Sequence, residues 1–103
     1  MQVGLGHCSG VVESKVAVDT YYVDSHLAVR ETIREKNSRY VPTQASSSSP
    51  VKLTPTKTTD PALAKGAALP TATAQDMKRV ADYFSKAYGT SNSPAAMDME
   101  FTI

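Results

Sequence analysis

The most regular pattern of apolar positions in the chain lies between Thr73 and Gly89. Apolar residues recur there at helical spacing and make one broad stripe, which consists of Met77, Val80, Ala81, Phe84, Ala87 and Tyr88. Thr73 and Asp76 have the spacing of a capping box, and Gly89 is a typical stop signal. The pattern predicts an amphipathic helix over 74–88. Its stripe is either the core of a folded domain or an anchor for a partner's groove.

A second pattern, with a period of two, runs through residues 11–23. This stretch is rich in Val, Thr and Tyr, which favour strands, and one of its faces carries Val12, Val16, Val18 and Tyr22. We predict a strand over 11–23. No second strand is available to pair with it, so it either joins a partner's sheet or is the start of a helix.

Residues 25–37 have the features of a shorter helix. Asp24 or Ser25 can cap its first turn, and Pro42 prevents the helix from continuing. Its apolar side is thin and consists of Leu27, Val29 and Ile33, extended by Tyr22 and Tyr40. Together, the predicted strand and helix form an N-terminal docking region over 1–41.

Residues 42–73 have a different composition. They hold five of the six prolines, the serine run 46–49 and no aromatic residue. Such a segment cannot bury enough apolar surface to offset the entropy of ordering it, which is about 1–2 kcal/mol per residue for the backbone. We predict a disordered Ser/Thr/Pro/Ala linker. Ser49 and Thr54, like Ser93 further along, precede prolines and would be accessible to proline-directed phosphorylation.

The C-terminal residues return to a period of two. Met97, Met99, Phe101 and Ile103 alternate with Asp98, Glu100 and Thr102. In an extended chain, the first set shares one face. The pattern predicts an extended tail after the helix, which either adds a strand to a partner's sheet or is a simple terminus.

Composition limits the core that this chain can form. Leu, Ile, Val and Phe together number 19 of 103 residues, below the ~20% at which a folded core becomes doubtful. We therefore expect a mostly irregular or extended chain with two short α-helices and one or two isolated strands. It would not be a self-sufficient compact domain. The alternative is a compact small α+β domain.

Charge and cysteine content narrow the function classes. The net charge of +1 lacks the electrostatic footprint of a nucleic-acid binder. The basic residues of the predicted helix are interleaved with Glu31 and Glu35, as on a solvated face or a surface for an acidic partner: Arg30, Arg34, Lys36 and Arg39. The single Cys8 cannot form an internal disulfide, and neither a secretory signal nor a membrane span is evident. We expect a soluble, cytoplasmic protein in a reducing compartment.

No group of residues has the spacing of a catalytic or metal site. The segment Gly4–Gly10 lacks the preceding strand of a dinucleotide fingerprint. The candidate ligands His7, Cys8, Asp24 and His26 lack the spacing of a structural zinc site. Asp98 and Glu100 lie in the tail, where nothing would hold them for acid–base chemistry. We expect no catalytic residue, no cofactor and no metal, although an enzyme subunit contributing Cys8 or His26 is a third alternative.

Two short segments resemble parts of cyanobacterial phycobilisome linker proteins. They are Tyr21-Tyr22-Val23-Asp24-Ser25-His26-Leu27-Ala28-Val29-Arg30 and Arg39-Tyr40-Val41-Pro42. The order of docking region, Ser/Thr/Pro-rich tether and terminal anchor is also similar to that of the small linkers of the antenna core. The resemblance implies bilin-binding antenna proteins as partners, at the cytoplasmic face of the thylakoid. It carries over no functional residue.

These observations predict a non-catalytic linker or adaptor that docks short segments onto a larger protein assembly. The alternative is a compact regulatory or nucleic-acid-associated α+β domain. The residues expected to bind the partner are Tyr22, Leu27, Val29, Ile33, Arg39, Tyr40, Met77, Val80, Phe84, Tyr88, Phe101 and Ile103.

Overall fold

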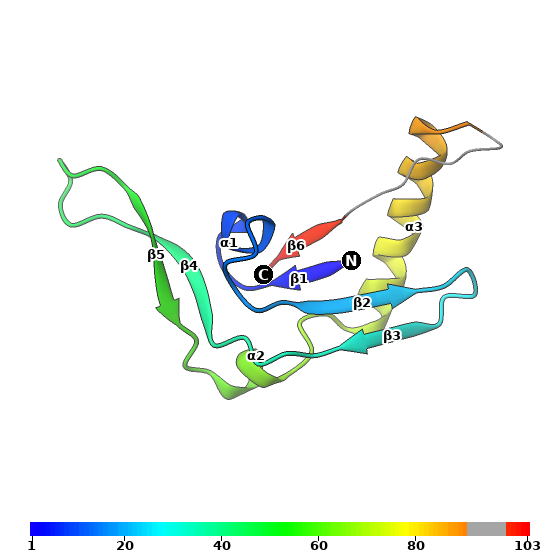
Figure 1. The fold of residues 1–103 in the computed structure, drawn as a ribbon, viewed down its shortest axis with the longest axis horizontal. Coiled ribbons are helices and arrows are strands. Elements are labelled where there is room, and N and C mark those ends of the chain that lie inside the picture. Colours follow the sequence, from blue (N-terminus) through cyan, green and yellow to red (C-terminus); the bar gives the residue numbers. More distant parts are fainter. Residues whose placement is uncertain (91–98) are drawn as a thin grey trace.

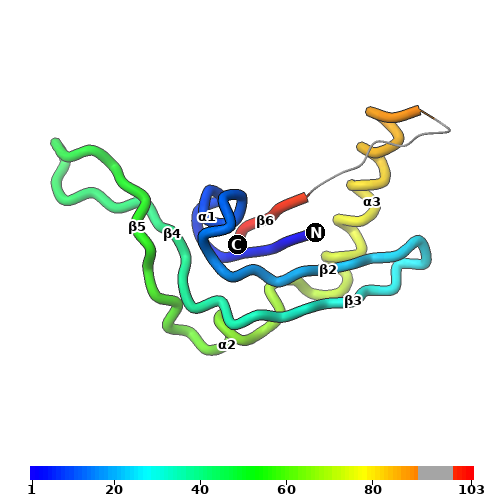
Figure 2. The backbone as a smooth tube through the Cα atoms, in the orientation of Figure 1, coloured from blue at the N-terminus to red at the C-terminus, as the bar shows by residue number. Residues whose placement is uncertain are grey.

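Strands and helices are distributed along the whole described part of the chain. The structure is a computed structural model that describes residues 1–90 and 99–103. Its elements are, in order, β1 (Gln2–Gly4), α1 (Cys8–Val12), β2 (Asp19–Val23), β3 (Val29–Thr32), β4 (Ser38–Thr43), β5 (Lys52–Lys57), α2 (Pro61–Lys65), α3 (Thr71–Tyr88) and β6 (Glu100–Thr102). Figure 1 and Figure 2 show a central body with the β4–β5 hairpin on one side and α3 on the other.

The body is built on a four-stranded sheet with the order β3-β2-β1-β6. Strand β2 is antiparallel to both β1 and β3, whereas β6 runs parallel to β1. The register places Val3 between Asp19 of β2 and Phe101 of β6. The first and last strands of the chain therefore lie side by side (Figure 1).

One face of this sheet carries the core, and α3 covers it. Val3, Tyr21 and Ala74 are fully buried at the centre, and around them pack the partly buried Met1, Val23, Val29, Ile33, Ala68, Leu69 and Phe101. Helix α1 lies against the opposite face, because a Cβ on Gly4 would come 2.4 Å from Val11 Cγ2. Neighbouring residues of a strand point to opposite faces, so Val3 and Gly4 contact different layers.

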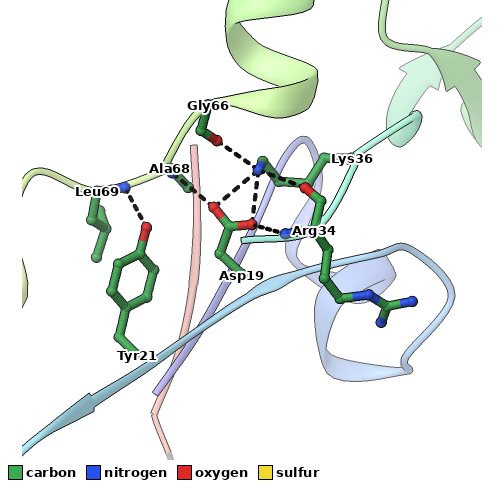
Figure 3. A network of polar contacts seen from close by, with 7 residues as sticks. All are labelled: Asp19, Tyr21, Arg34, Lys36, Gly66, Ala68 and Leu69. Carbon is green, nitrogen blue, oxygen red and sulfur yellow. Dashed lines mark hydrogen bonds and ion pairs between the residues drawn. The ribbon is translucent and has the colours of Figure 1, made fainter. Parts of the chain in front are cut away.

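Two fully buried side chains of opposite charge join the sheet to the segment that follows α2. Lys36 Nζ donates to both carboxylate oxygens of Asp19, at 2.8 and 2.9 Å, and to the carbonyls of Arg34 and Gly66. The Asp19 carboxylate also accepts from the amides of Arg34 and Ala68 (Figure 3). A buried ion pair is tolerated when its remaining donors and acceptors are also satisfied. This Asp19–Lys36 network meets that condition.

Tyr21 fixes the same segment from the next position on the same face of β2, two residues after Asp19. The amide of Leu69 donates to the Tyr21 hydroxyl at 3.0 Å (Figure 3). Burial raises the pKa of the Tyr21 phenol above its ordinary value of 10.0, although the Leu69 hydrogen bond acts in the opposite direction. Residues 66–69 are thus positioned by polar side chains of the sheet.

The β4–β5 hairpin forms a separate two-stranded ribbon, which we call the arm (residues 38–57). It extends away from the body and makes the molecule 54 Å long but only 18 Å thick (Figure 2). The radius of gyration is 16.3 Å, whereas about 13 Å is typical of a globular chain of this length. The difference reflects the projecting arm.

The expectation of a mostly irregular chain that is not a compact domain is wrong. The chain is a compact α+β fold, and the stated alternative had the correct fold class. The argument from composition failed because it counted only apolar residues. Here, the buried Asp19, Lys36 and Tyr21 order segments that carry little apolar surface.

The predicted elements of the first 41 residues also differ from those observed. Only the end of the expected 11–23 strand is a strand, β2, because Val11 and Val12 belong to α1. The expected helix over 25–37 is absent, and its place is taken by a β-hairpin and the chain that leads to β4. Asp24 Oδ1 accepts from the amides of His26 and Ala28, so it closes the hairpin turn instead of capping a helix.

The segment expected to be a disordered linker, 42–73, contains the end of β4, β5, α2 and the start of α3. Pro42 and Pro55 lie in strands of a two-stranded ribbon, where prolines are tolerated. Asp60 Oδ1 accepts from the Ala62 amide and caps α2, with Pro61 in the first turn. Local capping and the Asp19–Lys36 network order this segment without aromatic residues.

The C-terminal part agrees better with expectation. The structure contains the helix expected over 74–88 as α3, which starts earlier, at Thr71, and has Gly89 as its C-cap. The expected capping box is absent, because Thr73 lies inside the helix and Asp76 pairs with Arg79. Within the expected extended tail, Glu100–Thr102 forms β6 on the chain's own sheet rather than on a partner's. Ser93, Met97 and Asp98 lie outside the described residues.

Candidate docking surfaces

The register of the arm sorts its side chains into two faces. Opposite residues of an antiparallel pair share a face, and successive residues alternate. One face, which we call the arm face, pairs Tyr40 with Pro55, Pro42 with Leu53 and, at the base of the arm, Ser38 with Lys57. The other is mostly polar and pairs Arg39 with Thr56, Val41 with Thr54 and Thr43 with Lys52. The arm is therefore an amphipathic ribbon.

The base of the arm face is anchored on the body, and its outer part is exposed. A Cβ on Gly10 would lie 2.9 Å from Tyr40 Cδ2, so Tyr40 packs on α1. Lys15 Nζ lies 5.8 Å from the centre of the same ring, and a hydrogen bond to Glu13 raises the pKa of Lys15. Beyond this anchor, Leu53 is 40% exposed and both prolines are exposed.

The hydrogen-bonding edges of the arm are less available than its faces. Pro42 and Pro55 have no amide to offer to an incoming strand, and the carbonyl of Tyr40 already accepts from the His7 amide at 2.7 Å. Prolines on edge strands hinder pairing with further strands. The arm is therefore suited to contact through its faces.

A second exposed apolar surface lies on α3. Val80, Tyr83, Phe84, Ala87 and Tyr88 recur at helical spacing and are all exposed; we call them the helix stripe. The rings of Tyr83 and Phe84 meet edge to face at 5.6 Å, and those of Phe84 and Tyr88 stack at 6.0 Å. The less exposed residues in this half of the helix are small or polar: Ala81, Asp82 and Ser85. Of the two roles that the sequence left open for the stripe, core or anchor, the outward position agrees with the second.

A groove of about 300 Å³ separates α3 from the edge of the body. Its apolar lining includes Met1, Met77 and Met99, and Lys78 and Asp82 form an ion pair in its wall. Methionine side chains adapt to irregular apolar ligands. No cluster of buried polar groups accompanies these methionines among the lining residues, so the groove specifies no ligand chemistry.

Charge is distributed unevenly between the arm and the rest of the molecule. Between Ser38 and Lys57, the basic residues Arg39, Lys52 and Lys57 stand without any acidic residue. The arm thus carries +3, and because the whole chain carries +1, the remaining residues together carry −2. A net charge of +1 conceals this separation.

The residues expected to bind a partner are divided among several environments. Val29, Ile33 and Phe101 pack against the core, and Leu27 lies in the β2–β3 turn, where its carbonyl accepts from Gln75. The others lie on or near open surfaces: Tyr22 on the sheet, Arg39 and Tyr40 at the base of the arm, Met77 in the groove, Val80, Phe84 and Tyr88 in the helix stripe, and Ile103 at the end of the sheet.

Sequence reasoning missed the outer arm face. Its signal was present, since Leu53 and Pro55 alternate with Thr54 and Thr56 at a period of two. The proline content of the segment led instead to the prediction of a disordered linker. The buried Lys36 was also missed, because it was assigned to a solvated helix face, whereas it is fully buried against Asp19.

The candidate chemical groups do not converge. His7 Nδ1 accepts from the Ser9 amide and caps α1, and the exposed Cys8 thiol lies 4.0 Å from that nitrogen. Within residues 1–90 and 99–103, no three His, Cys, Asp or Glu side chains are grouped to hold a metal ion. None of the helices in the same residues is long and apolar enough to cross a membrane.

Comparisons with known proteins identify no relative of this chain. No family model, curated protein or solved structure matches the chain. The function must therefore be argued from the arm face and the helix stripe.

Proposed function

We propose that this chain is a non-catalytic adaptor that docks onto a larger protein assembly through its arm. The observation that carries the proposal is the arm face, an apolar surface on a ribbon that projects beyond the body. Isolated two-stranded hairpins are marginally stable in water. An arm whose face exposes Pro42, Leu53 and Pro55 gains stability when another surface covers it.

The mode of docking follows from the chemistry of the arm. Its prolines hinder strand addition, so the contact is made face to face. The exposed part of the arm face, Pro42, Leu53 and Pro55, is apolar. The arm is therefore suited to a partner that presents an apolar surface.

Site-specific photo-crosslinking tests this function. A photoreactive amino acid replaces Leu53 on the arm face, and a matched variant carries it at Thr54 on the polar face. Each purified variant is irradiated in an extract of the cells that produce the protein, and adducts are identified by mass spectrometry. The adaptor function requires protein adducts from position 53 that position 54 does not give. Equal or absent labelling from the two positions would refute it.

The identity of the assembly rests on the resemblance to phycobilisome linkers, which stays a prediction. It implies that adducts from position 53 contain bilin-binding antenna proteins. These adducts would show bilin absorbance after separation. Adducts without bilin would retain the adaptor function and remove the antenna as its partner.

A second candidate is a nucleic-acid-associated protein, favoured by the +3 charge of the arm. Its polar face carries Arg39 and Lys52, and a two-stranded ribbon fits the major groove of DNA. Binding through the two cations of this face predicts a slope of log affinity against log salt of about −2. Fluorescence anisotropy with duplex DNA at low salt measures this. No binding at low salt would eliminate the candidate.

A further inference from the structure

Two segments of the arm carry the same short pattern, a hydroxyl residue followed by proline and, two positions after the proline, by lysine. They are Ser49-Pro50-Val51-Lys52, which we call the tip motif, and Thr54-Pro55-Thr56-Lys57, the strand motif. The third hydroxyl–proline pair of the chain, Ser93-Pro94, has Ala96 where these motifs have lysine. Protein kinases select substrates partly by the charges around the acceptor, and proline-directed kinases read this pattern. The sequence alone makes both motifs substrates of one enzyme.

The fold separates the two motifs by the cost of releasing their backbone. A kinase takes the acceptor and its neighbours into its cleft as an extended segment, so pairing of that segment within the substrate competes with binding. Side-chain exposure would favour Thr54, which is exposed, over Ser49, which is half-buried. Backbone opening reverses that order, because surface turns open at little cost, whereas paired strands open at a cost of up to the free energy of global unfolding.

The strand motif is paired along its whole length. Its four residues lie opposite four residues of β4, which are Val41, Tyr40, Arg39 and Ser38. The Thr54 hydroxyl also lies 2.5 Å from Thr43 Oγ1 across the ribbon. Because Tyr40 packs on α1, releasing this motif separates the two strands and detaches the base of the arm from the body.

The tip motif lies almost entirely outside the ladder. Strand β4 ends at Thr43 and β5 begins at Lys52, so only the lysine of this motif is paired. The Ser49 amide donates to the Ser46 carbonyl at 3.0 Å, and the Ser49 carbonyl accepts from the Gln44 side chain at 2.6 Å. The Ser49 hydroxyl lies 2.8 Å from that of Ser46. These contacts belong to one surface turn, which can open while both strands stay paired.

We propose that Ser49 is a phosphorylation site for a proline-directed protein kinase, and that the fold withholds Thr54 from the same enzyme. In this reaction, Ser49 Oγ forms a bond to the γ-phosphorus of ATP. The bond from that phosphorus to the bridging oxygen breaks, ADP leaves, and the hydroxyl proton passes to the catalytic aspartate of the kinase. The modification is a property beyond the adaptor function and does not depend on it.

Phosphorylation changes the charge of the arm. A phosphoserine carries about −1.5 to −2 at pH 7, so the charge of the arm falls from +3 to between about +1 and +1.5. The new anion lies at the end of the arm that points away from the body (Figure 1). The modified arm therefore loses most of its electrostatic attraction for acidic surfaces.

A variant with two identical acceptors tests the selection by the fold. Ser49→Thr gives both motifs the sequence Thr-Pro-x-Lys, so a remaining difference in rate comes from the structure around each motif. The full-length variant is incubated with a purified proline-directed kinase and ATP, and mass spectrometry of its peptides measures the rate at each position. Position 49 should be phosphorylated at least about tenfold faster than position 54, which corresponds to a difference of about 1.4 kcal/mol in opening free energy.

A second substitution tests whether pairing in the arm protects Thr54. Val41 lies directly opposite Thr54, and glycine is a poor strand former. In the Ser49→Thr background, Val41→Gly should raise the rate at position 54 several-fold and leave the rate at position 49 unchanged. Val41→Thr keeps a β-branched side chain at the same place and is the matched control. Circular dichroism verifies that the body remains folded in each variant.

Protein isolated from the cells that produce it, with phosphatases inhibited, should carry phosphate at Ser49 and not at Thr54. Four results would overturn the proposal. In the kinase assay, these are equal rates at the two positions, no phosphorylation at position 49, or a rate at position 54 that Val41→Gly leaves unchanged. In the isolated protein, it is the absence of phosphate from Ser49.

Discussion

Replacing Lys36 by methionine should destabilise the fold more than any change at a surface ion pair. Methionine keeps much of the length of the lysine stem but removes the ammonium group. The Asp19 carboxylate then keeps only its two backbone donors, the amides of Arg34 and Ala68. The carbonyls of Arg34 and Gly66 also lose a donor. One substitution thus leaves a buried charge and two partly buried carbonyls without their partner.

The size of the effect follows from these losses. Removing one member of a buried ion pair typically costs about 3–5 kcal/mol. A domain of this length has a total unfolding free energy of roughly 5–15 kcal/mol. Each kcal/mol lowers the melting temperature by about 4–8 °C at this size, so Lys36→Met should lower it by at least about 12 °C. Lys78→Met is the matched control, because it breaks a partly exposed pair with Asp82, which is worth about 1 kcal/mol or less.

Urea denaturation followed by circular dichroism at 222 nm measures both variants. An unchanged m-value would show that the difference lies in stability rather than in the extent of unfolding. The double variant Asp19→Asn/Lys36→Met removes the uncompensated charge, so its loss should be smaller than the sum of the two single losses by at least about 1 kcal/mol. A loss for Lys36→Met no larger than that for Lys78→Met, or additive losses in the double variant, would refute the network as the link between sheet and segment.

Three further predictions concern the same body. Because the pKa of Tyr21 is raised from 10.0 in the folded chain, the phenol of the unfolded chain ionises first as the pH rises. The free energy of unfolding should therefore be unaffected by this group below about pH 10 and should fall as the pH rises through the folded-state pKa. Tyr21→Phe should flatten this fall in urea titrations. Gly4→Ala should cost about 1–3 kcal/mol, since its methyl would collide with the stiff side chain of Val11, and an unaltered melting temperature would contradict this. Deleting 101–103 removes β6 and the partly buried Phe101, so hydrogen exchange of β1 amides should accelerate, whereas unchanged protection would show that β6 does not support the sheet.

The elements that sequence reasoning found are those with a long local signal. Helix α3 has 18 residues, several turns of apolar spacing and a terminal Gly89, and all of these are readable from neighbouring positions. The end of the tail, Glu100–Thr102, was correctly predicted to be extended for the same reason. Its strand partner was not, because pairing of β6 with β1 joins the two ends of the chain. Local patterns carry no information about that distance.

The elements that were missed depend on competition or on distant contacts. Asp24 suits a helix cap and a hairpin turn equally well, and the β-branched residues after the turn favour the hairpin. Asp19 bonds to Lys36, which is 17 positions away, and to Ala68, which is 49 away. No composition rule or periodicity detects such a network. The order it gives to residues 66–69 was therefore unforeseeable from their own sequence.

The low apolar content of the chain bears on function once the fold is known. Among the described residues, seven apolar side chains are buried, while ten large ones are exposed. A chain with few large apolar residues gains stability by burying them, so leaving Leu53, Phe84 and Tyr88 outside forgoes part of that gain. Exposed apolar surface of this kind, gathered in patches rather than scattered, marks interaction sites. The buried polar network supplies order that apolar side chains would otherwise provide, and these side chains remain available for contacts between molecules.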